Sequence, residues 1–240
     1  MPAPRARRPW RTVAIVLVCA FAALVLTSPL TVRSFVMQPF NMPSGSMMPT
    51  LLIGDVFAAS KSAYGYTHYS LPFSPRLFPG RILAAEPQRG DVVVFRLPRD
   101  DTVDYVKRLV GLPGDRIQMR NGELLLNGTA VRRERIADFV YDEGGRNVQA
   151  KRWRETLPNG VSYETLDLQD NGFLDNTAEF VVPAGHYFML GDNRDNSVDS
   201  RLPNQVGYVP FDNLIGRVTL IFYSLDGATI RYDRIGLQVR

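Results

Sequence analysis

The chain has 240 residues, a net charge of +4 and a hydrophobic content of 45%, which fit a globular body of one or two domains plus a membrane anchor. Four arginines lie before residue 12, so the charge excess gives no support to a nucleic-acid-binding face. The single cysteine, Cys19, lies inside an apolar run, which excludes a disulfide framework and a cysteine-based metal site.

An uncharged apolar segment follows the basic N-terminus. Residues 13–26 read VAIVLVCAFAALVL, and weaker apolar character continues to residue 30. Such a run fits a membrane anchor and equally a cleavable secretory signal, and the residues alone leave both open. Because the basic residues precede it, the positive-inside rule predicts a cytoplasmic N-terminus and an exported body in either case. The β-prone residues 32–40 then predict a strand.

Two serines occur in a stretch with a restrained backbone. Residues 42–51 read MPSGSMMPTL. Pro43 and Pro49 each hold φ near about −65°, whereas Gly45 allows another backbone to approach the two flanking serines. By themselves these residues describe an ordinary turn that carries two hydroxyl groups.

An aromatic, proline-rich segment follows a short strand predicted at residues 56–59. Residues 62–79 read SAYGYTHYSLPFSPRLFP, and their prolines exclude a regular helix, so we expect an extended loop or an irregular hairpin. Two interpretations remain open. The loop folds onto its own core, or its aromatic side chains enter a membrane interface.

The next two predicted strands, at 92–95 and 104–110, carry a lysine among apolar neighbours. Strand alternation places Lys107 and Arg108 on opposite faces, so one cation is expected to face inward. Lys107 is either a snorkelling residue on an edge strand or a buried lysine whose lowered pKa suits it to act as a general base. Pro113 and Gly114 predict a type II turn after the second strand.

Residues 116–183 alternate short strand-like pieces with turn dipeptides and predict an antiparallel insert without evident chemistry. The following segment, 191–201, reads GDNRDNSVDSR and is almost entirely polar. It does not fit a calcium-binding EF-hand loop, because Arg194 and Ser197 occupy the wrong positions. We expect instead an ion network of the aspartates with arginines, formed by Asp192, Asp195, Asp199, Arg194, Arg201 and Arg108. A strand at 214–223 and a surface tail at 232–240 complete the chain.

Three of these stretches together resemble the signature motifs of bacterial type I signal peptidases, in the order found in that family. They are MPSGSMMPTL at 42–51, YVKRLVGLPGDR at 105–116 and GDNRDNSVDSR at 191–201, and the strand at 90–95 resembles a fourth motif. The resemblance implies a mainly β protein: a single N-terminal transmembrane helix, a β-rich catalytic core and an inserted second antiparallel β domain. Some family members have two membrane segments, whereas this chain has one.

The resemblance also implies a domain organisation, from the N-terminus to the C-terminus. It comprises a cytoplasmic basic segment (1–12), a transmembrane anchor (13–30), the first part of the catalytic core (31–115, with the membrane-proximal loop 62–79), the inserted β domain (116–186), and the second part of the core with the C-terminal tail (187–240).

The resemblance also implies a Ser/Lys dyad without cofactor or metal. Ser46 would be the nucleophile, Lys107 the general base, Ser44 a donor to the oxyanion hole and Ser197 the residue that orients the lysine. A structural ion network would comprise Asp192, Arg194, Asp199 and Arg201. Shallow apolar substrate pockets would be lined by Phe40, Met42, Met47, Leu51, Phe57 and Val106.

The implied activity is removal of signal peptides from secretory pre-proteins after an A-x-A-like site, at the bacterial cytoplasmic membrane with the catalytic domain outside. The partners would be pre-proteins and the lipid bilayer, with the export translocon a further candidate and no nucleic acid. Two alternatives differ in mechanism or class. One is a Ser-His-Asp hydrolase that uses His186 and Asp192, and the other is a membrane-tethered binding module without catalysis.

Overall fold

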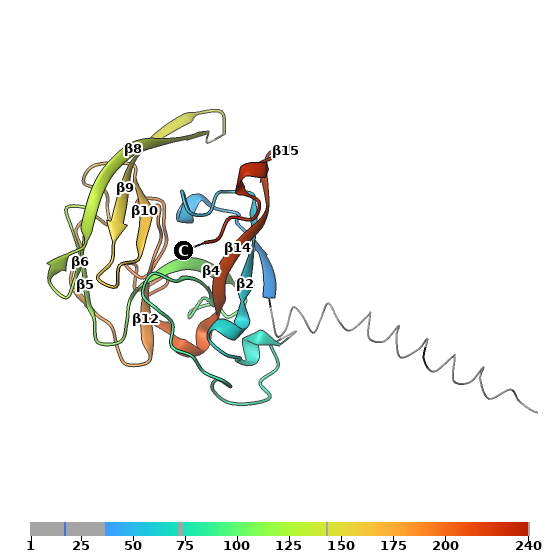
Figure 1. Ribbon diagram of the computed structural model, residues 1–240. Helices are drawn as coiled ribbons and strands as arrows, with labels where there is room; N and C mark the ends of the chain where they lie inside the picture. Colours follow the sequence, from blue (N-terminus) through green and yellow to red (C-terminus); the bar gives the residue numbers. More distant parts are fainter. Residues whose placement is uncertain (1–16, 18–36, 72–73, 143, 240) are drawn as a thin grey trace, which may run out of the picture.

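The computed structural model describes residues 17, 37–71, 74–142 and 144–239. Their strands form one large sheet and two smaller sheets, and short 3₁₀ helices lie between the strands (Figure 1). The predicted basic segment 1–12 and nearly all of the predicted anchor 13–30 lie outside the described residues. Within the described part of the chain, no helix is long and apolar enough to cross a membrane. The mainly β fold expected from the sequence is confirmed.

The largest sheet contains strands from both ends of the described chain. Its order is β1-β2-β14-β3-β4-β12-β13, with β15 paired to β14, and all neighbouring strands are antiparallel. The sheet is strongly curled (Figure 1). Its strands are β1 (Met37–Asn41), β2 (Asp55–Ser60), β3 (Val92–Arg96), β4 (Asp104–Gly111), β12 (His186–Leu190), β13 (Val209–Pro210), β14 (Leu214–Asp226) and β15 (Thr229–Ile230).

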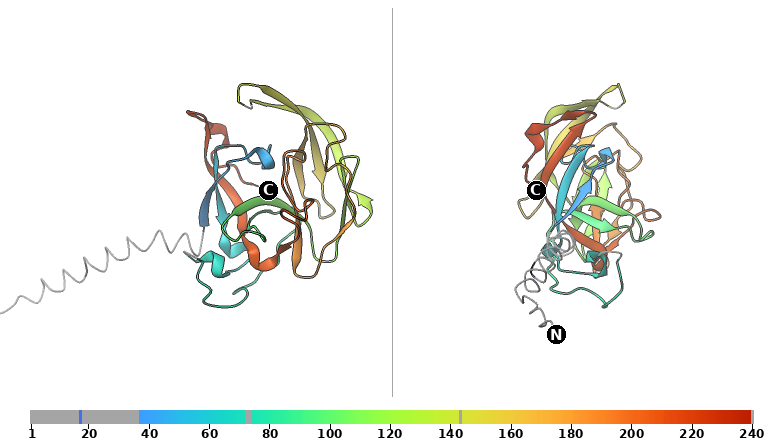
Figure 2. Two further views of the ribbon diagram at one scale, coloured as in Figure 1. Left: turned by 180° about the vertical axis from the view of Figure 1, so that it is seen from behind. Right: turned by 90° about the vertical axis from the view of Figure 1, so that its right-hand side faces the viewer.

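Two smaller sheets lie beside the largest one (Figure 2). One has the order β11-β5-β6-β7 and the other β10-β9-β8. Their strands are β5 (Arg116–Arg120), β6 (Glu123–Leu126), β7 (Thr129–Ala130), β8 (Arg132–Asp142), β9 (Asn147–Thr156), β10 (Ser162–Asp167) and β11 (Phe180–Val181). Asn127 and Gly128 both have positive φ, as a tight hairpin turn between β6 and β7 requires.

The large and small sheets share a hydrophobic core. One buried cluster joins Val110 and Phe188 of the large sheet to Ile117, Met119 and Leu124 of the four-stranded sheet. A second cluster lies within the large sheet and contains Phe57, Val92 and Ile221. Because the first cluster crosses from one sheet to the other, the smaller sheets are packed against the large one. The boundaries predicted for an inserted domain at 116–186 stay a prediction.

Strand β4 differs from the expectation that only one of its two central cations faces inward. Lys107 is 4% exposed and Arg108 is 0% exposed, so both are buried. Their side chains leave opposite faces of the strand, as strand alternation requires. Both faces are covered, because Lys107 contacts Ser46 on one face and Arg108 contacts Asp192 and Tyr163 on the other.

Two loop predictions have different outcomes. In the 62–79 segment, Tyr64 is fully buried and donates a hydrogen bond to Asp91 (2.9 Å), so this part folds onto the core. Leu77 in the same segment is exposed, and Phe73 lies outside the described residues. The turn at Pro113–Gly114 is confirmed, because Gly114 has a φ of 88° and the Asp115 N–H donates to the Leu112 carbonyl.

The C-terminal residues lie on the surface, as expected, with Tyr232 75% exposed and Leu237 45% exposed, but they do not form a free tail. A 3₁₀ helix, η5 (Tyr232–Arg234), brings Arg234 to Asp55, which is 0% exposed, at an N–O distance of 2.6 Å. Farther along, the Gly236 N–H donates to the Ile221 carbonyl of β14. The segment is therefore attached to the large sheet by an ion pair and by backbone hydrogen bonds.

Candidate active site

The loop after β1 presents Ser46 on a single 3₁₀ turn, η1 (Gly45–Met47). Backbone hydrogen bonds between Met42 and its neighbours Gly54 and Asp55 close the base of this loop. A Cβ at position 45 would lie 3.1 Å from Met48 Cε and 3.4 Å from Asn196 Nδ2, so glycine leaves room for the side chain of Asn196. The close approach at Gly45 is therefore made by the side chains of Met48 and Asn196, and not by another backbone as expected.

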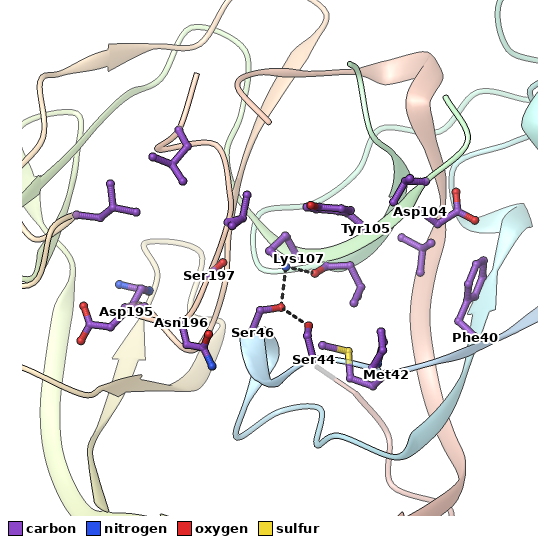
Figure 3. A pocket seen from close by; sticks show the side chains of 18 of the residues that line it. Phe40, Met42, Ser44, Ser46, Asp104, Tyr105, Lys107, Asp195, Asn196 and Ser197 are labelled. Atoms are coloured by element: carbon purple, nitrogen blue, oxygen red, sulfur yellow. Dashed lines mark hydrogen bonds between the residues drawn. The ribbon is translucent and has the colours of Figure 1, made fainter. Parts of the chain in front are cut away.

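The side chains of Ser46 and Lys107 meet at the centre of the site (Figure 3). Lys107 Nζ donates to Ser46 Oγ at 2.8 Å and to the Val106 carbonyl at 2.9 Å. Ser44 Oγ lies 3.2 Å from Ser46 Oγ. A serine with an amine and a second hydroxyl within hydrogen-bond distance has the arrangement that an activated nucleophile needs.

The environment of Lys107 favours its neutral form. Burial lowers the pKa of Lys107 to about 8, while the nearby carboxylates of Asp199 and Asp192 oppose this shift and Arg201 adds to it. Desolvation penalises the ammonium because a low-dielectric interior stabilises charge less well than water does. A lysine with this pKa is partly un-ionised at neutral pH and can accept the proton of the serine hydroxyl.

The polar 191–201 segment supports the loop that carries Ser46. The Asn193 N–H donates to the Ser46 carbonyl (3.1 Å), and Asn193 Nδ2 donates to the Gly45 carbonyl (3.1 Å). A Cβ on Gly191 would lie 2.1 Å from Ser197 Oγ and 2.7 Å from the Ser46 carbonyl oxygen. Only glycine allows the segment to lie this close to the nucleophile loop.

Part of the predicted ion network is confirmed. Arg108 forms a bidentate pair with Asp192, with N–O distances of 2.7 and 2.8 Å, and its guanidinium lies over the ring of Tyr163. Arg201 and Asp199 pair at 2.8 Å within the same segment. Arg201, the N–H of Gly191 and the hydroxyl of Ser197 together outweigh burial and lower the pKa of Asp199. These pairs rigidify the segment that faces Ser46.

Two members of the predicted network have other partners. Arg194 pairs with Glu155 of β9 at 2.5 Å and with none of the aspartates near it in sequence. Asp195 accepts hydrogen bonds from the backbone N–H groups of Leu168 (2.8 Å) and Gln169 (3.1 Å). The prediction was wrong for these two residues because their partners come from the smaller sheets, whose position relative to the segment is a long-range property.

Ser197 lies beside the dyad without contacting the amine. Among the described residues, the two hydrogen bonds of Lys107 Nζ are to Ser46 and Val106. The buried hydroxyl of Ser197 forms no hydrogen bond with the described residues, although it lies near enough to Asp199 to help to lower the pKa of that carboxyl group. The orienting role expected for Ser197 therefore stays a prediction.

A cleft of about 650 Å³ contains the dyad. Four of the residues predicted to line the substrate pockets line this cleft, namely Phe40, Met42, Phe57 and Val106. Met47 and Leu51 do not line it, and both are 0% exposed. Their placement in a pocket wall is corrected, because both side chains pack into the core of the large sheet, Met47 from η1 and Leu51 from the turn after it.

Other residues of the cleft wall were missed from the sequence. Tyr105 is two residues before Lys107 on β4 and so shares its face, a signal that strand alternation provides. Asn196 and Val198 belong to the 191–201 motif but were given no role in the cleft, and no motif marked Gln169, Phe173 and Leu174. These last three belong to the loop after β10, which the sequence assigned to an insert without chemistry.

The histidine alternative finds no support in the geometry. His186 Nδ1 lies 2.9 Å from the Ala184 carbonyl, and the ring of His68 packs against Tyr69. Neither histidine lines the cleft that contains Ser46. Across the described residues, no group of histidine, cysteine, aspartate and glutamate side chains could hold a metal ion.

Comparisons with known proteins agree with the motif pattern. A family model described as signal peptidase, peptidase S26, matches residues 10–223. Signal peptidase I of Rickettsia conorii is 43% identical over 210 residues, which cover 84% of this chain and 77% of that protein. Signal peptidase I of Rickettsia typhi is 42% identical over 208 residues, covering 83% and 77%.

Among solved structures, a signal peptidase I from Enterococcus faecalis V583 is 28% identical, with a TM-score of 0.33, and the match covers 56% of this chain and 98% of that one. The family assignment rests on the sequence comparisons, because the family model spans most of the chain and the relatives align along most of both sequences. The chain belongs to the signal peptidase family, peptidase S26, and is a serine peptidase.

Proposed function

We propose that the protein is a membrane-bound endopeptidase that removes N-terminal signal peptides from exported pre-proteins by a Ser46/Lys107 dyad. The observation that carries this proposal is the 2.8 Å contact between Lys107 Nζ and Ser46 Oγ in a cleft. Burial of the lysine supports it, because a pKa of about 8 makes the free amine available as a base.

In the first step Ser46 Oγ attacks the scissile carbonyl carbon while Lys107 Nζ takes the hydroxyl proton. The negative charge on the carbonyl oxygen is stabilised by the N–H of Ser46 and by the hydroxyl of Ser44, whose Oγ lies 3.2 Å from the nucleophile. The C–N bond then breaks, and Lys107 returns the proton to the leaving amine. The signal peptide remains attached to Ser46 as an ester.

In the second step water releases the signal peptide. Lys107 takes a proton from the water as its oxygen attacks the ester carbonyl, and the same donors stabilise the oxyanion. The C–O bond to Ser46 breaks, and the protonated lysine returns the proton to Ser46 Oγ. In this proposal Ser197 orients the lysine through the polar segment, and the pairs Arg108–Asp192 and Arg201–Asp199 hold that segment in place.

The apolar part of the cleft would select small side chains before the cut. Phe40, Met42, Phe57 and Val106 leave shallow space beside Ser46, which suits an A-x-A-like site and excludes large side chains by overlap. The rings of Phe40 and Phe57 are stacked, with centroids 6.0 Å apart, which makes this wall rigid.

We further propose the membrane arrangement that the sequence implies. Residues 13–30 would anchor the protein in the cytoplasmic membrane with residues 1–12 inside and the catalytic body outside. Residues 31–115 and 187–240 would form the catalytic core, and 116–186 an inserted domain. Secretory pre-proteins would be the substrates, the lipid bilayer a second partner and the export translocon a third.

The test is cleavage of a purified pre-protein by the full chain in detergent, with N-terminal sequencing of the product. Ser46→Ala should abolish the product, whereas Ser162→Ala, which changes an exposed serine outside the cleft, should leave it unchanged. A product that persists in Ser46→Ala would contradict the dyad. If the wild-type protein binds the pre-protein and forms no Ser46-dependent product, the binding-module alternative gains support instead.

A further inference from the structure

The cleft continues past the nucleophile on the side away from Phe40. In Figure 3, Ser46 and Lys107 lie centrally, with Phe40 and Asp104 to one side and Asp195, Asn196 and Ser197 to the other. Under the proposed function, the half that contains Phe40 takes substrate residues before the cut. An extended peptide advances about 3.3 Å per residue, so the residues after the cut must run along the opposite half.

The wall of that opposite half is partly apolar, and two of its apolar side chains, Phe173 and Val198, are exposed. It comprises Gln169, Phe173 and Leu174 from the loop after β10, together with Asn196 and Val198. Phe173 is 86% exposed and Val198 is 38% exposed. An apolar side chain that is exposed on the wall of an active-site cleft gains contact area when an apolar ligand side chain covers it.

The loop after β10 is attached to the same segment that supports Ser46. Asp195 accepts hydrogen bonds from the N–H groups of Leu168 and Gln169, and a Cβ on Gly172 would lie 2.4 Å from Asp195 Oδ1. Asp175 accepts a hydrogen bond from the Gly172 N–H at 2.6 Å. The backbone that carries Phe173 is thereby held at a defined place relative to the nucleophile.

The connection extends to the nucleophile itself. The Leu166 N–H donates to the Asp192 carbonyl, the Arg194 N–H donates to the Leu166 carbonyl, and the Asn193 N–H donates to the Ser46 carbonyl. Backbone hydrogen bonds therefore link β10 of the smaller sheet to the 191–201 segment, and that segment to Ser46. Because the backbone of this wall is already held in place, substrate binding does not incur the entropy cost of ordering a loop.

We propose that Phe173, with Leu174 and Val198, forms a subsite that binds an apolar side chain among the first three residues after the scissile bond. The protein would then read the start of the mature chain as well as the end of the signal peptide. This inference rests on the proposed function, since it takes the direction of the substrate from the pocket assignment on the Phe40 side.

The test uses peptides that share one Ala-x-Ala sequence before the cut and carry Leu or Ser, one position at a time, at the first three positions after it. For the full chain in detergent, we expect the ratio of kcat/KM for Leu over Ser to be about tenfold at one position, the scale of discrimination by one apolar contact. Phe173→Ser should bring this ratio close to one, and Phe173→Leu should retain most of it.

Two controls separate a subsite from a general effect. Tyr232→Ser removes another exposed aromatic side chain, one that does not line the cleft, and should leave the Leu/Ser ratio unchanged. Discrimination between Ala and Leu at the residue before the cut should be the same in Phe173→Ser and in the wild type. Since Phe173 is exposed, its replacement by Ser should not change the unfolding temperature.

Three outcomes would overturn the inference. The first is a wild-type Leu/Ser ratio of kcat/KM near one at all three positions, and the second is an unchanged Leu/Ser ratio in Phe173→Ser. The third is a loss of binding to lipid vesicles in Phe173→Ser with unchanged selectivity, which would assign the side chain to lipid. Cleavage that depends on Ser46 but shows any of these results overturns the subsite alone. Absence of Ser46-dependent cleavage overturns the proposed function and the subsite together.

Discussion

Lys107 Nζ donates a 2.8 Å hydrogen bond to Ser46 Oγ, although the two residues are 61 positions apart in the chain. The contact joins the first loop of the described chain to a central strand of the large sheet. It is made in a cleft whose polar wall holds the lysine beside two buried carboxylates.

Replacing Lys107 by Met should abolish cleavage while the protein stays folded. Methionine fills a similar volume and removes the proton acceptor, and general-base catalysis contributes about 10²- to 10⁴-fold in rate. Single-turnover cleavage of a pre-protein measures the loss, and circular dichroism checks the fold. Lys107→Arg should be equally inactive, since a guanidinium stays protonated. Wild-type rates in either variant would show that another group is the base.

The cleavage rate should rise with pH through about pH 8. The active form of Lys107 is the free amine, and burial lowers the pKa of this residue to about 8, so the active fraction is small at pH 6 and large at pH 9. The pH profile of kcat/KM reports the pKa of the free enzyme. A rate that is flat from pH 6 to 10, measured with a substrate without ionisable groups near the cut, would contradict this assignment.

Ser44→Ala should slow the chemical step and leave substrate binding largely unchanged. Its hydroxyl is proposed to stabilise the oxyanion, and removal of one such donor costs about 10²- to 10³-fold in kcat. Ser44 is exposed, so the fold should tolerate the change. Ser44→Thr keeps the hydroxyl group and serves as the matched variant. Equal losses in kcat for Ala and Thr would argue against a hydrogen-bonding role.

Arg108→Leu should destabilise the protein strongly. The pair of Arg108 and Asp192 is buried, with side-chain exposures of 0% and 1%, and the substitution leaves the carboxylate in the interior without its bidentate partner. Breaking such a pair costs about 3–5 kcal/mol of unfolding free energy. Urea denaturation measures this. The pair of Arg116 and Glu179 is largely exposed, so Arg116→Leu is a control that should change the midpoint little.

Asp167→Asn should stabilise the protein at neutral pH and have no effect below about pH 4. Burial and the neighbouring carboxylates of Asp195 and Asp175 raise the pKa of Asp167 to about 6 from its ordinary value of 3.8. The folded state therefore binds more protons than the unfolded state between these values, and stability falls as pH rises through this range. Asparagine avoids that loss, which should be about 1 kcal/mol at pH 7.5 after allowance for partial exposure.

Denaturation curves at pH 4 and pH 7.5 provide the comparison for Asp167. A stability gain of equal size at both pH values would show that the amide acts through packing or hydrogen bonding. No gain at pH 7.5 would show that the carboxyl group is better solvated than its surroundings indicate.

The predictions that failed share a physical cause. Met47 and Leu51 were expected in the pocket wall from the family resemblance, but both side chains pack into the core of the large sheet. Arg194 was expected to pair within its own segment, and its partner Glu155 comes from β9. The direction of the Met47 and Leu51 side chains depends on how their loop folds onto the large sheet, and the partner of Arg194 depends on how a smaller sheet packs beside it. A local pattern encodes neither.

The sequence by itself determined the local features of this protein. The apolar run at β3, the turn at Pro113–Gly114 and the motifs that carry Ser46 and Lys107 depend on residues near one another in the chain, so propensity and pattern suffice to predict them. Only the tertiary structure decided that Lys107 and Arg108 are both buried, and that Phe173 reaches the cleft. These facts require the smaller sheets to cover the second face of β4 and to deliver a loop beside Ser46, and both are long-range packing effects.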